Sequence, residues 1–281
     1  MYIPSLTSAP ATGLCRRYHI ASRAPFGTAW CLALAAFLVS SGCPVAAQDQ
    51  SRVEPRLLLG TRSAQYGGIF VVNTHPVEDF KAAKPTLHII IPTTGRKTLF
   101  KMIRSLESQL SSEDHLTIGF DGQDKEGIFE EVQHMLRTMP GNNEAIMEQK
   151  YGDMGNSIRD KHKKEKGDFV MFADDDNWYV PDALSTVRAV VSNDWDALYV
   201  FQLQMAESPG SRIPNIHQGG EVEYGNVDSG CGVIPVKHVH HSDWFQDVYG
   251  ADGQFYHQLS ERLPRTYLIP KVIFVYSGAH G

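Results

Sequence analysis

The sequence predicts an α/β fold in which helices cover both faces of a mostly parallel sheet. From Leu87 onward, short apolar runs alternate with segments whose apolar residues recur at helical spacing, as in parallel sheets with crossover helices. One apolar run ends in three successive carboxylates, Asp174, Asp175 and Asp176. The chain has 281 residues and is 42% hydrophobic, so it can bury a sizeable core in one large domain, with or without an appendage.

The first 48 residues differ in composition from the rest. They contain Arg16, Arg17 and Arg23 but no lysine, aspartate or glutamate, and an apolar run follows over residues 29–47. This pattern predicts a signal peptide or a short type II membrane anchor over residues 1–48, and a mitochondrial or plastid presequence would share it. Positive charge before the apolar run predicts that the body of the protein is sent across the membrane.

Beyond this leader the chain is acidic. Without the three leader arginines, 23 of the 26 basic residues are left against 32 acidic ones, a formal charge of −9, and such a body binds nucleic acid poorly. Only Cys231 of the four cysteines lies beyond the leader, so the body has no internal disulfide. Residues 49–84 predict a stem or linker with one possible strand at the apolar patch 69–72, and residues 85–281 predict the organised domain.

The organised domain opens with a strand, a turn and a helix. Residues 88–91 (HIII) predict a buried strand, and the letters PTTG that follow predict a turn. A helix is then predicted by apolar residues at helical spacing, namely Leu99, Met102, Ile103, Leu106 and Leu110.

The remaining elements continue the alternation of strands and helices. The sequence predicts strands at 116–120, 145–148, 168–173 and 197–203, and helices at 128–139, 156–166 and 182–191. Asp121 directly follows the strand at 116–120, and the three carboxylates follow the strand at 168–173. In an open α/β sheet the carboxyl ends of the strands form the edge where ligands bind.

The three carboxylates are the most informative group in the sequence. Oxygen-rich acids at a strand end suit a hard cation such as Mg²⁺ or Mn²⁺, which commonly shares phosphate oxygens with its substrate. The alternative is a solvated turn with helix-capping carboxylates, because Pro181 and Asp182 begin a predicted helix just downstream.

Five motifs in order resemble the GT-A fold glycosyltransferases, especially the broad family 2 enzymes. They are PTTGR at 92–96, FDG at 120–122, GNSIRD at 155–160, FADDDNWY at 172–179 and GAD at 250–252. The acidic block is similar to that of the β-1,3-glucuronyltransferases, and the resemblance covers residues 87–276. The chain differs in having Arg159-Asp160 where Arg-Asn is usual and Asp252 where glutamate is frequent, which leaves the donor sugar and the subfamily open.

The resemblance implies a donor site for a nucleotide sugar. The turn residues would cradle uracil and ribose, Asp121 would accept a hydrogen bond from uracil, and Arg159 would lie near the phosphates. Asp174 would reach the ribose or a metal-bound water, Asp175 would support it, and Asp228 would contact the donor sugar. The full set of implied donor-binding residues is Pro92, Thr93, Thr94, Arg96, Asp121, Arg159, Asp174, Asp175, Asp228 and His280.

The same resemblance implies a metal and a base. Asp176, with Asp174, would bind Mn²⁺ or Mg²⁺ as cofactor, and Asp252 would be the general base of an inverting enzyme. The alternative for Asp252 is simple helix N-capping. Gly230 and Gly232 would let the backbone approach a ligand, or would mark a strand bulge.

The function expected from this resemblance is an inverting, metal-dependent glycosyltransferase. It would move a sugar from a nucleotide sugar, most naturally a UDP-sugar, to a hydroxyl of a glycan, lipid or protein acceptor. The alternative is a non-catalytic GT-A-like protein that binds carbohydrate or nucleotide. The leader predicts membrane association, as a type II Golgi protein in a eukaryote or a membrane or cytoplasmic enzyme in a bacterium. The cluster His238, His240 and His241 lacks the spacing of a zinc site, which favours surface or packing histidines.

Overall fold

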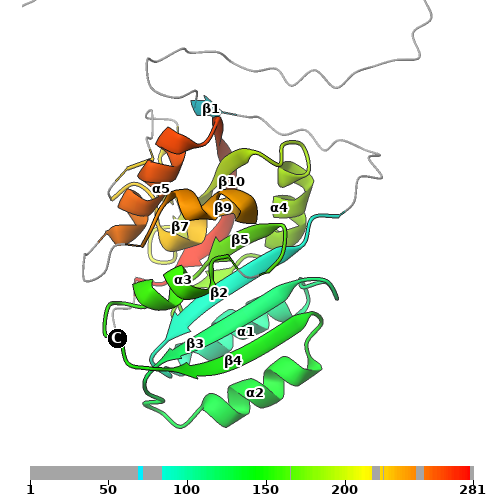
Figure 1. Cartoon of the computed structure of the whole chain (residues 1–281), viewed down its shortest axis with the longest axis vertical. Coiled ribbons are helices and arrows are strands. Elements are labelled where there is room, and N and C mark those ends of the chain that lie inside the picture. Colours follow the sequence, from blue (N-terminus) through cyan, green and yellow to red (C-terminus); the bar gives the residue numbers. More distant parts are fainter. Residues whose placement is uncertain are drawn as a thin grey trace, which may run out of the picture. The chain divides into compact units, whose positions relative to one another are not determined.

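A computed structural model describes residues 69–71, 84–164, 166–216, 222–223, 225–244 and 250–278 (Figure 1). The predicted leader and all of the predicted stem except residues 69–71 and 84 lie outside these ranges. Within the described part of the chain, no helix combines the length and the hydrophobicity needed to cross a bilayer.

The described residues build one ten-stranded sheet whose main path runs β1-β10-β7-β9-β5-β2-β3-β4. Neighbouring strands on this path are parallel except around β9, which runs antiparallel to both β5 and β7. The predicted mostly parallel α/β class is therefore confirmed. The path strands are β1 Ile69–Val71, β2 Leu87–Thr93, β3 His115–Asp121, β4 Asn142–Glu148, β5 Phe169–Phe172, β7 Ala197–Met205, β9 Gly232–Pro235 and β10 Arg265–Tyr276.

Two short strands lie off this path. They are β6 (Trp178–Tyr179), which pairs antiparallel with β10, and β8 (Arg212–Ile213), which pairs antiparallel with β7. Because β6 follows the acidic residues directly, its pairing fixes the far end of their loop to the sheet.

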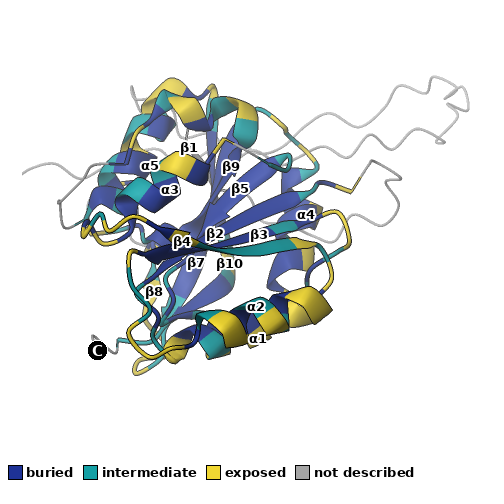
Figure 2. Ribbon diagram, turned by 60° about the horizontal axis from the view of Figure 1, so that its bottom comes forward, coloured by how far each residue is buried: buried dark blue, intermediate teal, exposed yellow. Residues whose placement is uncertain are grey.

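Helices cover both faces of the sheet. Figure 2 shows α3 and α5 on one face and α1 and α2 on the other. Each long helix buries one side; in α1 the buried residues recur at helical spacing. The α-helices are α1 Thr98–Glu107, α2 Phe129–Thr138, α3 Asn156–His162, α4 Ala183–Val191 and α5 Ala251–Arg262, and the 3₁₀ helices are η2 Ser229–Cys231 and η3 Val236–His241.

The central strands carry the most continuous apolar sequence. Every residue of β2 and of β5 is buried, as expected for parallel strands covered on both faces. At the sheet edge, β4 is mostly half-buried or exposed. The turn at 92–96 and the acidic block thus emerge from the carboxyl ends of two completely buried strands, β2 and β5.

One strand precedes the predicted domain boundary. The apolar patch at 69–72 contributes β1, which pairs in parallel with the start of β10 over three residue pairs. The sheet therefore extends N-terminal to residue 85, into the segment interpreted as stem.

We expect a chain that begins at Val53 to fold and to stay in solution, because it lacks the leader and keeps β1. A chain that begins at Lys84 lacks β1 and is expected to unfold at a lower temperature, since β10 then has unpaired backbone groups along one edge. Thermal unfolding of the two chains, followed by circular dichroism, tests the difference. Aggregation of the Val53 chain, with the full chain well behaved, would contradict the placement of the leader outside the fold.

Candidate functional site

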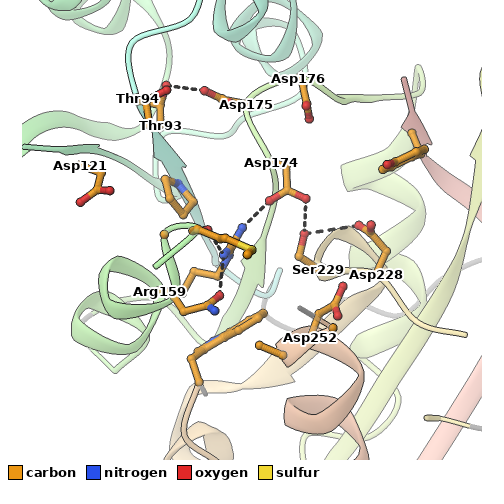
Figure 3. A pocket seen from close by; sticks show the side chains of 18 of the residues that line it. Thr93, Thr94, Asp121, Arg159, Asp174, Asp175, Asp176, Asp228, Ser229 and Asp252 are labelled. Carbon is orange, nitrogen blue, oxygen red and sulfur yellow. Dashed lines mark hydrogen bonds and ion pairs between the residues drawn. The ribbon is translucent and has the colours of Figure 1, made fainter. Parts of the chain in front are cut away.

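A cleft of about 770 Å³ opens where the carboxyl ends of β2, β3 and β5 meet the starts of η2 and α5. Figure 3 shows Asp121 at one end of it, Asp228 and Asp252 at the other, and Asp174 between them. The cleft brings together every predicted site residue in the described ranges, and His280 lies outside those ranges. The predicted residues that line it are Pro92, Thr93, Thr94, Arg96, Asp121, Arg159, Asp174, Asp175, Asp176, Asp228 and Asp252.

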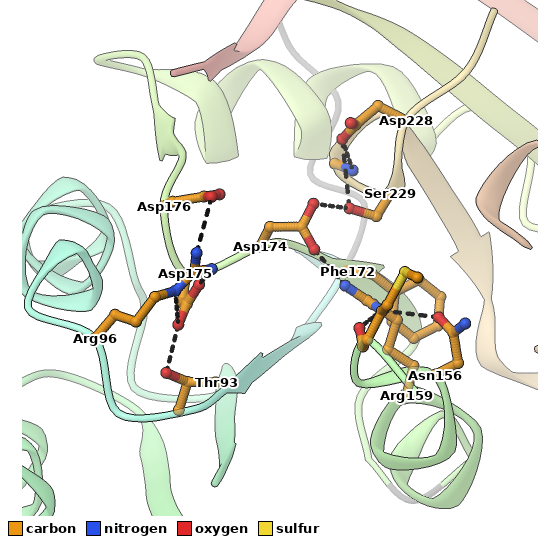
Figure 4. Close-up of polar contacts among 12 residues, drawn as sticks. Thr93, Arg96, Asn156, Arg159, Phe172, Asp174, Asp175, Asp176, Asp228 and Ser229 are labelled. Carbon is orange, nitrogen blue, oxygen red and sulfur yellow. Dashed lines mark hydrogen bonds and ion pairs between the residues drawn. The ribbon is translucent and has the colours of Figure 1, made fainter. Parts of the chain in front are cut away.

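Asp175 joins the acidic block to the turn after β2 (Figure 4). Its carboxylate is buried, accepts a hydrogen bond from Thr93 Oγ1 at 2.5 Å, and is paired with the guanidinium of Arg96, whose Nε lies 3.3 Å from Oδ2. Asp175 therefore points into the protein and fixes the position of the turn. The alternative of a solvated acidic turn does not hold for this residue.

Asp174 is held on both of its carboxylate oxygens. Arg159 Nη2 pairs with one oxygen, and Ser229 Oγ donates to the other at 2.9 Å. The guanidinium of Arg159 also donates to the carbonyl of Met154 at 3.0 Å and lies 4.9 Å from the centre of the Trp244 ring. Arg159, predicted to lie near phosphates, is thus buried beside Asp174 and orients that carboxylate.

Asp176 is the least engaged of the three acids. Its side chain is 16% exposed, and its nearest cation is Arg96, with Nη1 3.4 Å from Oδ2. Burial, together with the charges of Asp174 and Asp175, raises the pKa of Asp176, and Arg96 opposes this shift. A carboxylate that is costly to ionise and only weakly paired has the properties of a cation ligand.

A divalent cation would need further ligands at this place. Among the described residues, no group of three or more His, Cys, Asp or Glu side chains is arranged to hold a metal ion. Both oxygens of Asp174 already accept protein hydrogen bonds, so Asp176 would be the main protein ligand. This donor set fits Mg²⁺ or Mn²⁺ bound together with phosphate oxygens and water, which is the usual coordination of Mg²⁺ with nucleotides.

Asp252 lies in the first turn of α5 and lines the cleft. The N-cap of this helix is Gly250, with no side-chain capping hydrogen bond, so the N-cap alternative for Asp252 is wrong. Its Oδ1 accepts a hydrogen bond from the N–H of Gly253 at 2.8 Å. Burial, and then the charge of Asp174, raises the pKa of Asp252, while the Gly253 hydrogen bond and Arg159 oppose the rise.

Asp228 stands at the same end of the cleft, at the N-cap of η2, where it accepts a hydrogen bond from Gly230 N–H at 3.0 Å. Burial, with the charges of Asp174 and Asp252, raises its pKa to about 8. Three carboxylates from three separate segments, Asp174, Asp228 and Asp252, therefore converge at this end of the cleft.

This pKa predicts a stability effect. The ordinary pKa of aspartate is 3.8, and that of Asp228 in the folded protein is about 8. The folded protein therefore binds this proton more tightly than the unfolded chain does. As the pH rises from about 4 to about 8, Asp228 increasingly destabilises the fold. We expect Asp228→Asn to unfold at a higher temperature than the parent at about pH 8.5, and to differ less at about pH 5. Thermal unfolding in EDTA measures this; a difference that does not change with pH would contradict it.

The glycines of this segment serve packing within the core. A Cβ on Gly230 would lie 2.3 Å from the Phe274 ring, and one on Gly232 would lie 2.0 Å from the Tyr256 ring. The two glycines do allow a close approach to the backbone, as the sequence predicted, but the groups that approach are aromatic side chains of the core.

Asp121 anchors a neighbouring loop. Its buried carboxylate accepts hydrogen bonds from the N–H groups of Tyr151 (2.6 Å) and Gly152 (3.0 Å). The cleft lining also contains Lys125 and Lys150, which the sequence analysis did not predict as site residues. Their positive charges would suit a phosphorylated ligand.

Several further cleft residues were not predicted, and three of them contact or neighbour the predicted site residues. They are Met154, Ser229 and Trp244. Ser229 and Asp174 lie 55 positions apart, and Trp244 joins the site through its contact with Arg159. Of the three, only Ser229 could have been suggested by the sequence, because it directly follows the predicted site residue Asp228.

The histidine cluster is outside the cleft lining. His238 Nε2 lies 2.9 Å from Asp196 Oδ1, and the rings of His240 and His241 are 4.1 Å apart. Within the part of the chain that the structure describes, these histidines belong to no group that could hold a metal ion.

Solved structures with a similar fold include those of S. aureus TarS. TarS 1–349 in complex with UDP-GlcNAc aligns at 16% identity with a TM-score of 0.59, over 70% of this chain and 59% of that one. TarS 1–349 in complex with UDP aligns at 15% identity with a TM-score of 0.56, over 69% and 61%. A longer TarS structure aligns at 15% identity with a TM-score of 0.54, over 68% and 36%.

This similarity establishes the fold. The described part of this chain shares the GT-A-like α/β fold of TarS. The chain matches about three fifths of the length of TarS 1–349 and about a third of the longer TarS structure. No protein-family model matches the sequence, and no curated protein matches it significantly.

Proposed function

We propose that this chain is a glycosyltransferase that transfers a sugar from a UDP-sugar to an acceptor hydroxyl with inversion at the anomeric carbon. The observation that carries the proposal is the single cleft that gathers all described candidate residues. Support comes from the fold shared with TarS, which was solved with UDP and with UDP-GlcNAc.

The donor nucleotide would bind at the Asp121 end of the cleft. There the turn at 92–96 is rigid because Asp175 holds Thr93 and Arg96, and Asp121 holds the backbone at 151–152. Preformed polar groups at strand ends bind a nucleoside with little loss of side-chain entropy. Lys125 and Lys150 would add positive charge near the phosphates.

Mn²⁺ or Mg²⁺ would be bound by Asp176 with the donor diphosphate, supported by Asp174. Such a cation supplies positive charge that stabilises the leaving diphosphate. Arg159 and Ser229 keep Asp174 oriented, and Arg96 offsets part of the repulsion among the three acids.

Asp252 would act as the general base. Its carboxylate would accept the proton of the acceptor hydroxyl while that oxygen forms a bond to the anomeric carbon, and the bond from this carbon to the phosphate oxygen would break with its electron pair leaving on UDP. A base with a raised pKa accepts a proton more readily near neutral pH than an ordinary aspartate does. Burial of Asp252 supplies that shift.

Titration calorimetry with UDP, with and without Mn²⁺, tests the donor site, and a screen of nucleotide sugars for hydrolysis or transfer tests turnover. UDP binding with slow release of UDP from one nucleotide sugar supports the proposal. UDP binding without turnover of any donor would favour the non-catalytic binding protein, and a lack of binding by any uridine nucleotide would overturn both.

We also propose that residues 1–48 direct the protein to a membrane, as a type II Golgi protein if the source is eukaryotic. The compositional change after residue 48 supports this proposal. Nucleotide sugars would then have to be present on the side of the membrane that holds the body of the protein.

A further inference from the structure

The cleft contains an apolar side chain that contributes little to the fold. Met154 lines the cleft and is 64% exposed, more than any other large hydrophobic residue in the described part of the chain. The other two exposed residues of this kind, Met147 at 45% and Trp195 at 36%, do not line the cleft. An apolar side chain left in water inside a pocket indicates a contact that forms when a ligand binds.

The backbone of Met154 is strained. Its φ is +58°, in the left-handed region, where a residue with a long side chain is unfavourable. Asp182, with φ +62°, is the only other non-glycine residue with positive φ among those described, and aspartate tolerates this conformation better than methionine. Strain of this kind persists where the surroundings impose it, and it is concentrated at functional sites.

The surroundings of Met154 do impose it. Asp121 holds the N–H groups of Tyr151 and Gly152, and Asp153 accepts a hydrogen bond from Ser157 N–H at 2.9 Å. Arg159 Nη1 donates to the carbonyl of Met154 itself at 3.0 Å. The loop at 151–157 is thus fixed before, at and after Met154. The Met154 side chain is held at the cleft although little of it is buried there.

We propose that Met154 packs on the bound nucleotide-sugar donor and that the strained loop exists to present it there. This inference rests on the proposed function. The donor is the fitting ligand because two of the groups that fix the loop, Asp121 and the Arg159–Asp174 pair, belong to the donor side of the cleft. A thioether side chain is flexible and polarisable, and it can cover an apolar face of either the nucleoside or the sugar.

The proposal predicts opposite changes in stability and affinity. Met154→Gly removes both the side chain and the strain, so we expect a melting temperature higher by roughly 2 to 4 °C and donor affinity lower by about 5- to 30-fold. Met154→Ala is expected to lower affinity by a similar factor without the gain in stability. Met147→Ala, a change of the same chemistry outside the cleft, should leave affinity unchanged.

Calorimetry of UDP and UDP-GlcNAc binding, together with thermal unfolding of each variant, makes the test. A loss of affinity for UDP places the contact on the nucleoside diphosphate, and a loss confined to UDP-GlcNAc places it on the sugar; either supports the proposal. If the parent binds these ligands and both Met154 variants bind them within two-fold of the parent, the inference is overturned while the proposed function stands. A parent that binds neither ligand overturns the proposed function, and this inference with it.

Discussion

Replacing Asp252 by asparagine is expected to lower kcat by about 10²- to 10⁴-fold, the range for loss of a general base. Asparagine has nearly the shape of aspartate, and its carbonyl oxygen can still accept the hydrogen bond from Gly253 N–H, but it cannot take a proton from the acceptor. The measurement is steady-state transfer with a donor found in the screen, alongside UDP affinity and thermal unfolding.

The control for Asp252 is the neighbouring acid. Asp228→Asn carries the same chemical change at the same end of the cleft. It is expected to affect turnover less, because the pKa of Asp228 is raised to about 8 and a carboxyl that is largely protonated near neutral pH cannot accept a proton. If Asp252→Asn turns over within a few-fold of the parent while Asp228→Asn collapses, the roles of the two acids must be exchanged.

If Asp176 is the main protein ligand of a cation, as we propose, Asp176→Asn is expected to abolish most activity. In the parent, UDP should bind more tightly with Mn²⁺ than in EDTA, and in the variant this difference should disappear. The fold should be little affected, or slightly stabilised, because Asp176 has no partner closer than Arg96 and its pKa is raised by burial and neighbouring acids.

Asp175→Asn is the matched control for Asp176→Asn. Asp175 is buried and bonded to Thr93 and Arg96, so its replacement should lower the melting temperature and weaken UDP binding with and without Mn²⁺ alike. If UDP binding does not depend on metal in the parent and is unchanged in Asp176→Asn, the proposal that Asp176 binds a cation is wrong.

Most of the fold could be predicted because the strands and helices alternate with a clear period. The long strand that escaped prediction is β10. It is apolar but interrupted by Pro270 and Lys271, and its pairing with β7 has register irregularities between Ile269 and Phe274. A proline and a charge inside an apolar run argue against a central strand. The strands β6 and β8 have two residues each, which is too short for any period to show.

The candidate site could be predicted where its residues follow parallel strands, because those strand ends meet at one edge. Asp121 and the acidic block are of this kind. For Arg159, which lines the cleft, a position near the donor phosphates stays a prediction; its ion pair with Asp174 is a contact that only the tertiary fold creates. The exposure and strain of Met154 likewise depend on hydrogen bonds from residues on other elements, which no local pattern reports.

The position of β9 has a consequence for how the chain assembles. This strand lies between β5 and β7 but comes from residues 232–235, after both of its neighbours have been synthesised. Until it inserts, β5 and β7 both have a free edge on the side that faces the gap, and free edges invite pairing between chains. Asp174 follows β5, Asp228 lies just before β9, and Asp252 lies after β9 in α5. The complete cleft therefore forms late. A chain that stops short of residue 232 lacks both β9 and β10, so β5 and both sides of β7 would lose strand partners and the site would lack Asp252.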